Sequence, residues 1–144
     1  MQEKWELFSH KADMGIRGIG PTFERAFEQA GLALTGVLMD PAQIKPETHV
    51  RLSCVAPKID ILFYDWVNEI IYAMAKEHIV FGRYSATIDQ NQTGQLTLQG
   101  EAWGEAIKPE KQQLAVEIKG ATFTELKAEA TENGECFVQC VVDV

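Results

Sequence analysis

The chain has 144 residues, of which 46% are hydrophobic, and these values fit one folded domain over residues 1–144. No apolar run is long enough to span a bilayer, and residues 1–4 lack the features of a secretion signal, so we expect a cytoplasmic protein with no membrane contact. The net charge is −8, from 13 basic and 21 acidic residues. This balance disfavours direct, tight nucleic-acid binding, and it fits docking onto a basic protein partner or simple solubility.

Two strands and a helix are expected in the first part of the chain. Alternating side chains predict strands over residues 4–8 and 14–19, with residues 9–13 as a polar break between them. A Gly-Pro turn then precedes Thr22, which has the side chain of a helix N-cap. Apolar residues recur at helical spacing from there, and the predicted helix ends near Met39 at an Asp-Pro pair.

The remaining pattern predicts a second helix and further strands. The helix follows Pro57 and has a broad apolar face, whereas residues 101–110 are polar and predict a charged loop. An Asn-Gly pair at residues 133–134 predicts a hairpin turn. Strands are expected over residues 50–55, 84–89, 95–100, 114–119, 122–128 and 136–142. These elements indicate an α+β domain in which two helices pack against antiparallel β-sheet.

The three cysteines give little sign of metal or redox chemistry. Cys54, Cys136 and Cys140 form no C-x-x-C pair, and the last two would face the same side of a strand. In a reducing compartment, this arrangement predicts free, mostly buried thiols that pack in the core.

The two ends of the chain carry the main candidate site. The Asp143 side chain and the Val144 α-carboxylate are one residue apart, and Asp13 lies with His10 in the polar break. Three oxygen donors brought together could hold a hard cation such as Ca²⁺ or Mg²⁺. Two interpretations stay open here. Asp143 could instead lie on a frayed tail, and Asp13 could cap the backbone amides of a turn.

Other polar groups are weaker candidates. Lys119 lies in an otherwise apolar run and is expected to pair with Glu101 or one of the carboxylates, unless its strand edge simply faces solvent. Asp65 and Glu69 are one helical turn apart, as acid–base residues could be, but a solvated helix face explains them better. No nucleophile elbow, phosphate-binding glycine loop or zinc-protease helix is present, so enzymatic signals are weak.

Taken together and in order, these segments resemble the archease family. Residues 10–13 look like the family's H-T-A-D, and residues 118–123 are similar to its I-K-A-x-T-Y. Lys11 stands where threonine is common, and Thr124 stands where many members have histidine. Residues 22–30 resemble the family's first helix, and residues 62–69 resemble its second helix with an Asn-Glu step. Residues 100–101 match a Gly-Glu pair, and residues 141–144 match the family's terminal hydrophobic-Asp-hydrophobic pattern.

The resemblance implies a protein cofactor and not an enzyme, without catalytic residues of its own. Archeases help a GTP-dependent RNA ligase to become guanylylated and to turn over repeatedly. That ligase joins 3′-phosphate or 2′,3′-cyclic-phosphate ends to 5′-hydroxyl ends in tRNA splicing and RNA repair. The resemblance further implies a divalent cation, Ca²⁺ first and Mg²⁺ or Mn²⁺ otherwise, and partner-facing side chains. The implied metal ligands are Asp13, Asp143 and Val144, and the implied partner-facing residues are His10, Lys119 and Glu101.

The leading hypothesis is therefore an activator of this RNA ligase that acts through an acidic metal site. A chaperone for DNA or RNA methyltransferases is the first alternative, and it predicts an activity that does not depend on Asp13 or Asp143. A small metal-dependent hydrolase is the second alternative, and it predicts turnover by the isolated protein.

Overall fold

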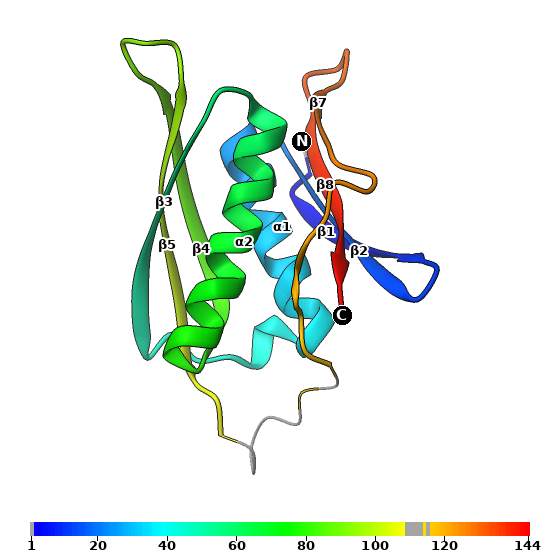
Figure 1. The fold of residues 1–144 in the computed structure, drawn as a ribbon, viewed down its shortest axis with the longest axis vertical. Coiled ribbons are helices and arrows are strands. Elements are labelled where there is room, and N and C mark those ends of the chain that lie inside the picture. The colour runs from blue at the N-terminus through cyan, green and yellow to red at the C-terminus, as the bar shows by residue number, and fades with distance from the viewer. Residues whose placement is uncertain (1, 109–113, 115) are drawn as a thin grey trace.

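A computed structural model describes residues 2–108, 114 and 116–144 of the chain. Two helices lie between two antiparallel sheets, as Figure 1 shows with one sheet on the left and the other on the right. The predicted α+β class, with two helices packed against antiparallel sheet, is confirmed. The sequence pattern had not separated the strands into two sheets, because alternation shows which side chains are buried and not which strands pair.

The first sheet contains both ends of the chain. Its strands follow the order β1-β2-β8-β6, and β7 also pairs with β8. All the pairings are antiparallel. The bounds are β1 Lys4–His10, β2 Asp13–Gly20, β6 Gly120–Ala121, β7 Lys127–Ala130 and β8 Cys136–Asp143.

The second sheet has three strands in the order β3-β5-β4. They are β3 Thr48–Ala56, β5 Leu96–Ala106 and β4 Ile79–Gln90. The free edge of β4 is covered by helix α1, because the Glu28 carboxylate accepts a hydrogen bond from the Ala86 amide at 2.9 Å. Capping an edge in this way blocks pairing with another chain.

Helix α1 spans Phe23–Leu38 and begins at Thr22, whose hydroxyl accepts a hydrogen bond from the Arg25 amide at 3.1 Å. The predicted N-cap and helix end are confirmed. A short 3₁₀ helix, η1, follows at Pro41–Gln43. Helix α2 spans Ile59–Glu77 and stops at His78, which adopts a left-handed backbone conformation. None of the helices in the described ranges is long and apolar enough to cross a membrane.

The core lies where the helices meet both sheets. Trp66 of α2 is fully buried, and its indole N–H donates a hydrogen bond to the Phe27 carbonyl of α1 at 3.1 Å. Helix α1 packs directly on β2 at Gly18, where a Cβ atom would lie 2.1 Å from the Ala26 carbonyl oxygen. The predicted burial of the free cysteines Cys54, Cys136 and Cys140 is confirmed.

Several predicted boundaries are wrong. Residues 101–106, expected in a polar loop, continue strand β5, while residues 109 and 110 lie outside the described residues. Tertiary context explains the difference, since β5 is the central strand and pairs with both β3 and β4. Its Glu105 side chain is fully buried and accepts a hydrogen bond from the Lys45 amide at 2.6 Å. Strand β4 also begins earlier than residue 84, because α2 ends at His78 and the strand starts at the next residue.

The segment before β7 differs most from the sequence expectation. Residues 114 and 116–119 are not in a strand, and residue 115 lies outside the described residues. Of the strand expected over residues 122–128, only residues 127–128 are in a strand, as the start of β7, and β6 covers residues 120–121. The Thr122 hydroxyl accepts a hydrogen bond from the Thr124 amide at 3.1 Å, and Glu125 has a φ of 57°. This local turn competes with strand pairing.

Candidate functional site

Three neighbouring strands place three predicted site residues in one row. Strand β1 pairs His10 with Asp13 of β2, and β2 pairs Met14 with Val142 of β8. Continuing the second register by one residue places Asp143 opposite Asp13. Side chains that lie directly opposite each other share a face of the sheet, with Cα atoms about 4.5–5.5 Å apart. The carboxylate row, defined as His10, Asp13 and Asp143, therefore projects from one face.

The carboxylate row lies on the face of the first sheet that points away from the helices. Val142 and Cys140 of β8 point inward and are fully buried, whereas Asp143 is exposed and His10 and Asp13 are partly exposed. The polar break proves shorter than residues 9–13, because His10 ends β1 and Asp13 begins β2. Only a two-residue turn separates the strands, so both side chains are held by strand pairing.

The structure brings the C-terminus to the turn end of the β1–β2 hairpin at this row. The Val144 amide donates a hydrogen bond to Asp13 Oδ1 at 3.3 Å. Among the described residues, Asp13 accepts this bond and none from an amide of the turn. In the structure, therefore, the C-terminal residues are not a frayed tail, and Asp13 does not cap the turn.

Lys119, the residue before strand β6, is held next to Asp143 by its backbone. The Lys119 amide donates a hydrogen bond to the Asp143 carbonyl at 2.7 Å, and Gly120 pairs with Asp143. The Lys119 side chain is exposed, and no carboxylate of the described residues lies within 4.0 Å of its ammonium group. Lys119 is therefore placed next to Asp143 by its backbone, and its side chain forms no ion pair within the described part of the chain.

Asn68 is a site-supporting residue to which sequence reasoning assigned no role. Its side-chain Oδ1 accepts a hydrogen bond from the Ala121 amide at 3.0 Å and ties β6 to helix α2. Asparagine is a poor helix former, and Asn68 lies in the interior of α2. That mismatch was the available signal, since a polar residue disfavoured by its element often has a tertiary partner.

Glu101 is not part of this assembly. It lies in the middle of β5, on the face of the second sheet that points away from the helices. Its carboxylate is 3.8 Å from His49 Nε2, and its side chain is 42% exposed. The helical layer separates Glu101 from the carboxylate row (Figure 1), so the expected pairing with Lys119 does not occur.

Asp65 and Glu69 are likewise not part of the row, since they lie on helix α2. Burial raises the pKa of Asp65, and both residues lie near the Cys54 thiol, whose pKa they help to raise. Burial is the main reason that the pKa of Cys54 and of Cys140 rises to about 12. These thiols are therefore protonated at neutral pH and are poor metal ligands.

The donor set of the row suits a hard cation. No three His, Cys, Asp or Glu side chains of the described residues converge closely enough to hold a metal. A site here would consist of the Asp13 and Asp143 carboxylates completed by the Val144 carboxylate. Carboxylate oxygens are the ligands that Ca²⁺ and Mg²⁺ prefer, and adjacent carboxylates repel each other until a cation lies between them.

Comparison with known proteins covers almost the whole chain. Residues 5–144 match the model of the Archease protein family (MTH1598/TM1083). "Protein archease" of Pyrococcus furiosus is 34% identical over 141 residues, which cover 98% of this chain and 99% of that protein. "Protein archease" of Methanosarcina mazei is 30% identical over 142 residues, which cover 99% of this chain and 97% of that protein.

A solved structure shows the same fold. The solution structure of Methanobacterium thermoautotrophicum protein 1598 superposes with a TM-score of 0.85. It is 29% identical in sequence, and the match covers 97% of this chain and 98% of that one.

Proposed function

Because the chain belongs to the archease family, we propose that it is an activator of a GTP-dependent RNA ligase and has no catalytic activity of its own. The ligase would be the one that joins 3′-phosphate or 2′,3′-cyclic-phosphate ends to 5′-hydroxyl ends. The chain would promote its guanylylation and its repeated turnover. The cytoplasm fits this role, since all three cysteines are unpaired.

The observation that carries the proposal is the contact between the C-terminus and the β1–β2 hairpin. The hydrogen bond from the Val144 amide to Asp13 brings an N-terminal carboxylate to the C-terminal residues. The Asp13 and Asp143 carboxylates and the Val144 α-carboxylate would hold one divalent cation. Ca²⁺ fits first, because it accepts irregular sets of oxygen ligands, and Mg²⁺ or Mn²⁺ is the alternative. When bound, the cation supplies positive charge for phosphate oxygens of the ligase nucleotide.

The residues around the row have supporting roles in this proposal. His10 extends the row on the β1 side, and Lys119 offers an exposed ammonium group next to β6. Both face the partner, whereas Glu101 lies too far away to share their role. The net charge of −8 supports contact with a basic protein and not with RNA itself.

A guanylylation assay tests the proposal. The ligase from the same source is incubated with labelled GTP and Mn²⁺, with wild-type chain, Asp143→Ala or Glu129→Gln. Asp143→Ala should lose most of the stimulation, because it removes one carboxylate of the row without disturbing the core. Glu129 is an exposed carboxylate of β7, so Glu129→Gln should stimulate like the wild type. Full stimulation by Asp143→Ala would refute the site.

The same samples separate the rival functions. A methyltransferase chaperone would suppress aggregation equally well with Asp13→Ala and Asp143→Ala. A metal-dependent hydrolase would cleave a phosphoester substrate without any ligase present.

A further inference from the structure

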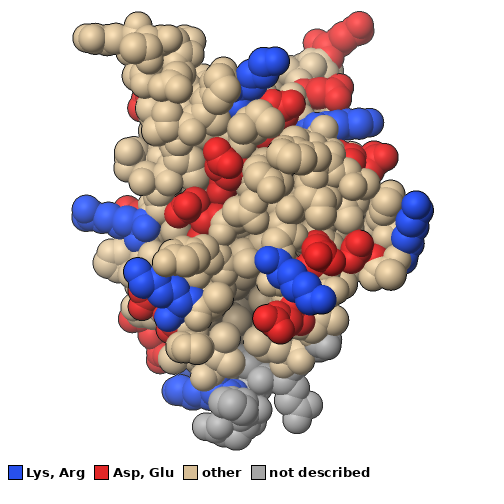
Figure 2. All heavy atoms as spheres, in the orientation of Figure 1, with Lys and Arg blue, Asp and Glu red and all other residues tan. Residues whose placement is uncertain are grey.

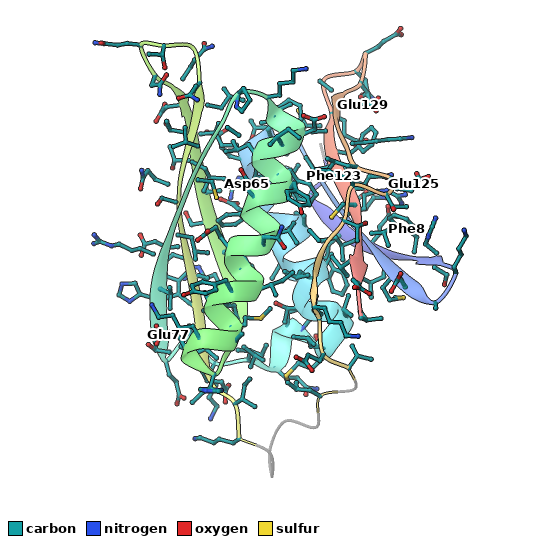
Figure 3. The ribbon with its side chains drawn as sticks, viewed as in Figure 1. Phe8, Asp65, Glu77, Phe123, Glu125 and Glu129 are labelled. Atoms are coloured by element: carbon teal, nitrogen blue, oxygen red, sulfur yellow. The ribbon has the colours of Figure 1, made fainter. Side chains whose placement is uncertain are left out.

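The two most exposed large hydrophobic side chains of the described residues lie on helix α2 or pack against it. Phe123 is 64% exposed and Tyr72 is 62% exposed. Tyr72 belongs to α2, and the Phe123 ring stacks on Tyr64 of α2 with centroids 4.4 Å apart and an interplanar angle of 16°. Figure 3 shows Phe123 beside the helix. We define the α2 surface as Tyr64, Asp65, Glu69, Tyr72 and Phe123.

Hydrogen bonds fix the chain around Phe123. The Phe123 carbonyl accepts a hydrogen bond from the Leu126 amide at 3.2 Å. The Thr122 hydroxyl donates to the Val141 carbonyl at 2.8 Å. Tyr72 lies on a rigid helix with the Lys76 ammonium 5.9 Å from its ring centroid. Because the Phe123 ring already stacks on Tyr64, fixing it in an interface costs little further conformational entropy.

Two carboxylates lie along the helix between the aromatic groups. Asp65 and Glu69 are one turn apart, and Tyr72 follows one turn later. No Lys, Arg or His side chain of the described residues lies within 4.0 Å of either carboxylate. Figure 2, which views the molecule with α2 in front, shows acidic side chains over this helix. The raised pKa of Asp65 is consistent with a partly buried carboxylate that lacks a cation.

We propose that the α2 surface binds a basic, arginine-bearing surface of a protein partner. That partner is the RNA ligase that the carboxylate row activates. The inference rests on the proposed function, and it adds a second contact area outside the metal site. A guanidinium group stacks on aromatic faces and forms paired hydrogen bonds with carboxylates. Interface hot spots are rich in tyrosine and arginine, and a protein that binds RNA has basic surface to offer.

The two contact areas are close enough for one partner. Phe123 follows Gly120 by three residues, and Gly120 pairs with Asp143 of the carboxylate row. Three residues of extended chain span about 10 Å. The row points away from the helices and Phe123 stacks on α2, so a partner that contacts both extends around the β6 edge of the first sheet.

The test measures the dissociation constant for the ligase from the same source by biolayer interferometry. One variant combines Phe123→Ala with Tyr72→Ala, and another combines Asp65→Asn with Glu69→Gln. The first should weaken binding about tenfold or more, as loss of a hot spot does. The second should slow association and reduce its salt dependence. Val55→Ala serves as the control, since Val55 is 54% exposed on β3 of the other sheet.

Calcium titration and thermal unfolding of each variant show whether the carboxylate row and the fold are intact. Weakened ligase binding with unchanged calcium affinity and unfolding temperature supports the docking surface. If both variants bind as tightly as wild type while Asp143→Ala still abolishes stimulation, the α2 surface is refuted and the proposed function stands. If the wild type does not bind the ligase, both proposals fail.

Discussion

Asn68 shows how a single side chain supports the row from a distance. Its side-chain oxygen accepts the Ala121 amide and so fixes the strand that pairs with Asp143. Asn68→Ala leaves that part-buried amide without its acceptor, and we expect a loss of about 1–3 kcal/mol in the free energy of unfolding. Asn68→Asp keeps an acceptor oxygen and should restore most of that loss. Urea denaturation measures both values.

Hydrogen exchange gives the local control for Asn68. The Ala121 amide should exchange faster in Asn68→Ala than in wild type, while the Trp66 region of the core exchanges at its usual rate. Equal exchange of the Ala121 amide in all three proteins would show that the hydrogen bond is not important in solution.

Glycine 18 sets the distance between β2 and helix α1. A Cβ atom there would lie 2.1 Å from the Ala26 carbonyl oxygen and 2.4 Å from the Ala30 nitrogen, and these backbone atoms cannot move aside. We expect Gly18→Ala to lower the free energy of unfolding by about 3 kcal/mol, at the upper end of overpacking costs. Gly120→Ala is the matched control, because the nearest atom to its Cβ would be Asn68 Oδ1 at 3.6 Å. Equal stability of the two variants in urea would contradict this packing.

The elements that sequence predicted best are those with a strong local signal. Helix α1 has an N-cap, a steady helical period and a stop, and its predicted bounds agree with the structure. Residues 116–128 were predicted poorly, because their conformation depends on the Thr122 turn and on the bond to Asn68. Neither contact leaves a periodic pattern in the sequence.

The sequence indicated only part of the candidate site, because it shows local signals and not which strands pair. Asp13 and Asp143 stood out as polar residues beside strands, but their meeting depends on a pairing between strands far apart in the chain. Glu101 was misplaced, because only the topology shows that β5 belongs to the other sheet.

At the scale of the whole molecule, the buried thiols should make the protein less stable as the pH rises above 9. Burial raises the pKa of Cys54 and Cys140 from 9.0 to about 12. Above pH 9 the unfolded chain releases thiol protons that the folded chain retains, so the free energy of unfolding falls as pH rises. The slope approaches about 1.4 kcal/mol per pH unit for each thiol.

Urea denaturation between pH 8 and 10.5 measures this slope. Cys54→Ala is less stable at every pH because it leaves a cavity, but its alkaline slope should be shallower than that of wild type. Parallel curves for the two proteins would mean that Cys54 does not retain its proton in the folded state.

Calcium titration by calorimetry tests most directly whether the C-terminus and the β1–β2 hairpin form a metal site. Wild-type protein should bind one Ca²⁺ ion, and Asp143→Asn should weaken that binding by about tenfold or more, because one charged ligand is lost. Glu129→Gln should bind like the wild type. A chain extended beyond Val144 should also bind more weakly, since its terminal carboxylate is displaced. Asp143→Asn protein that is folded and binds calcium as tightly as wild type would contradict the site.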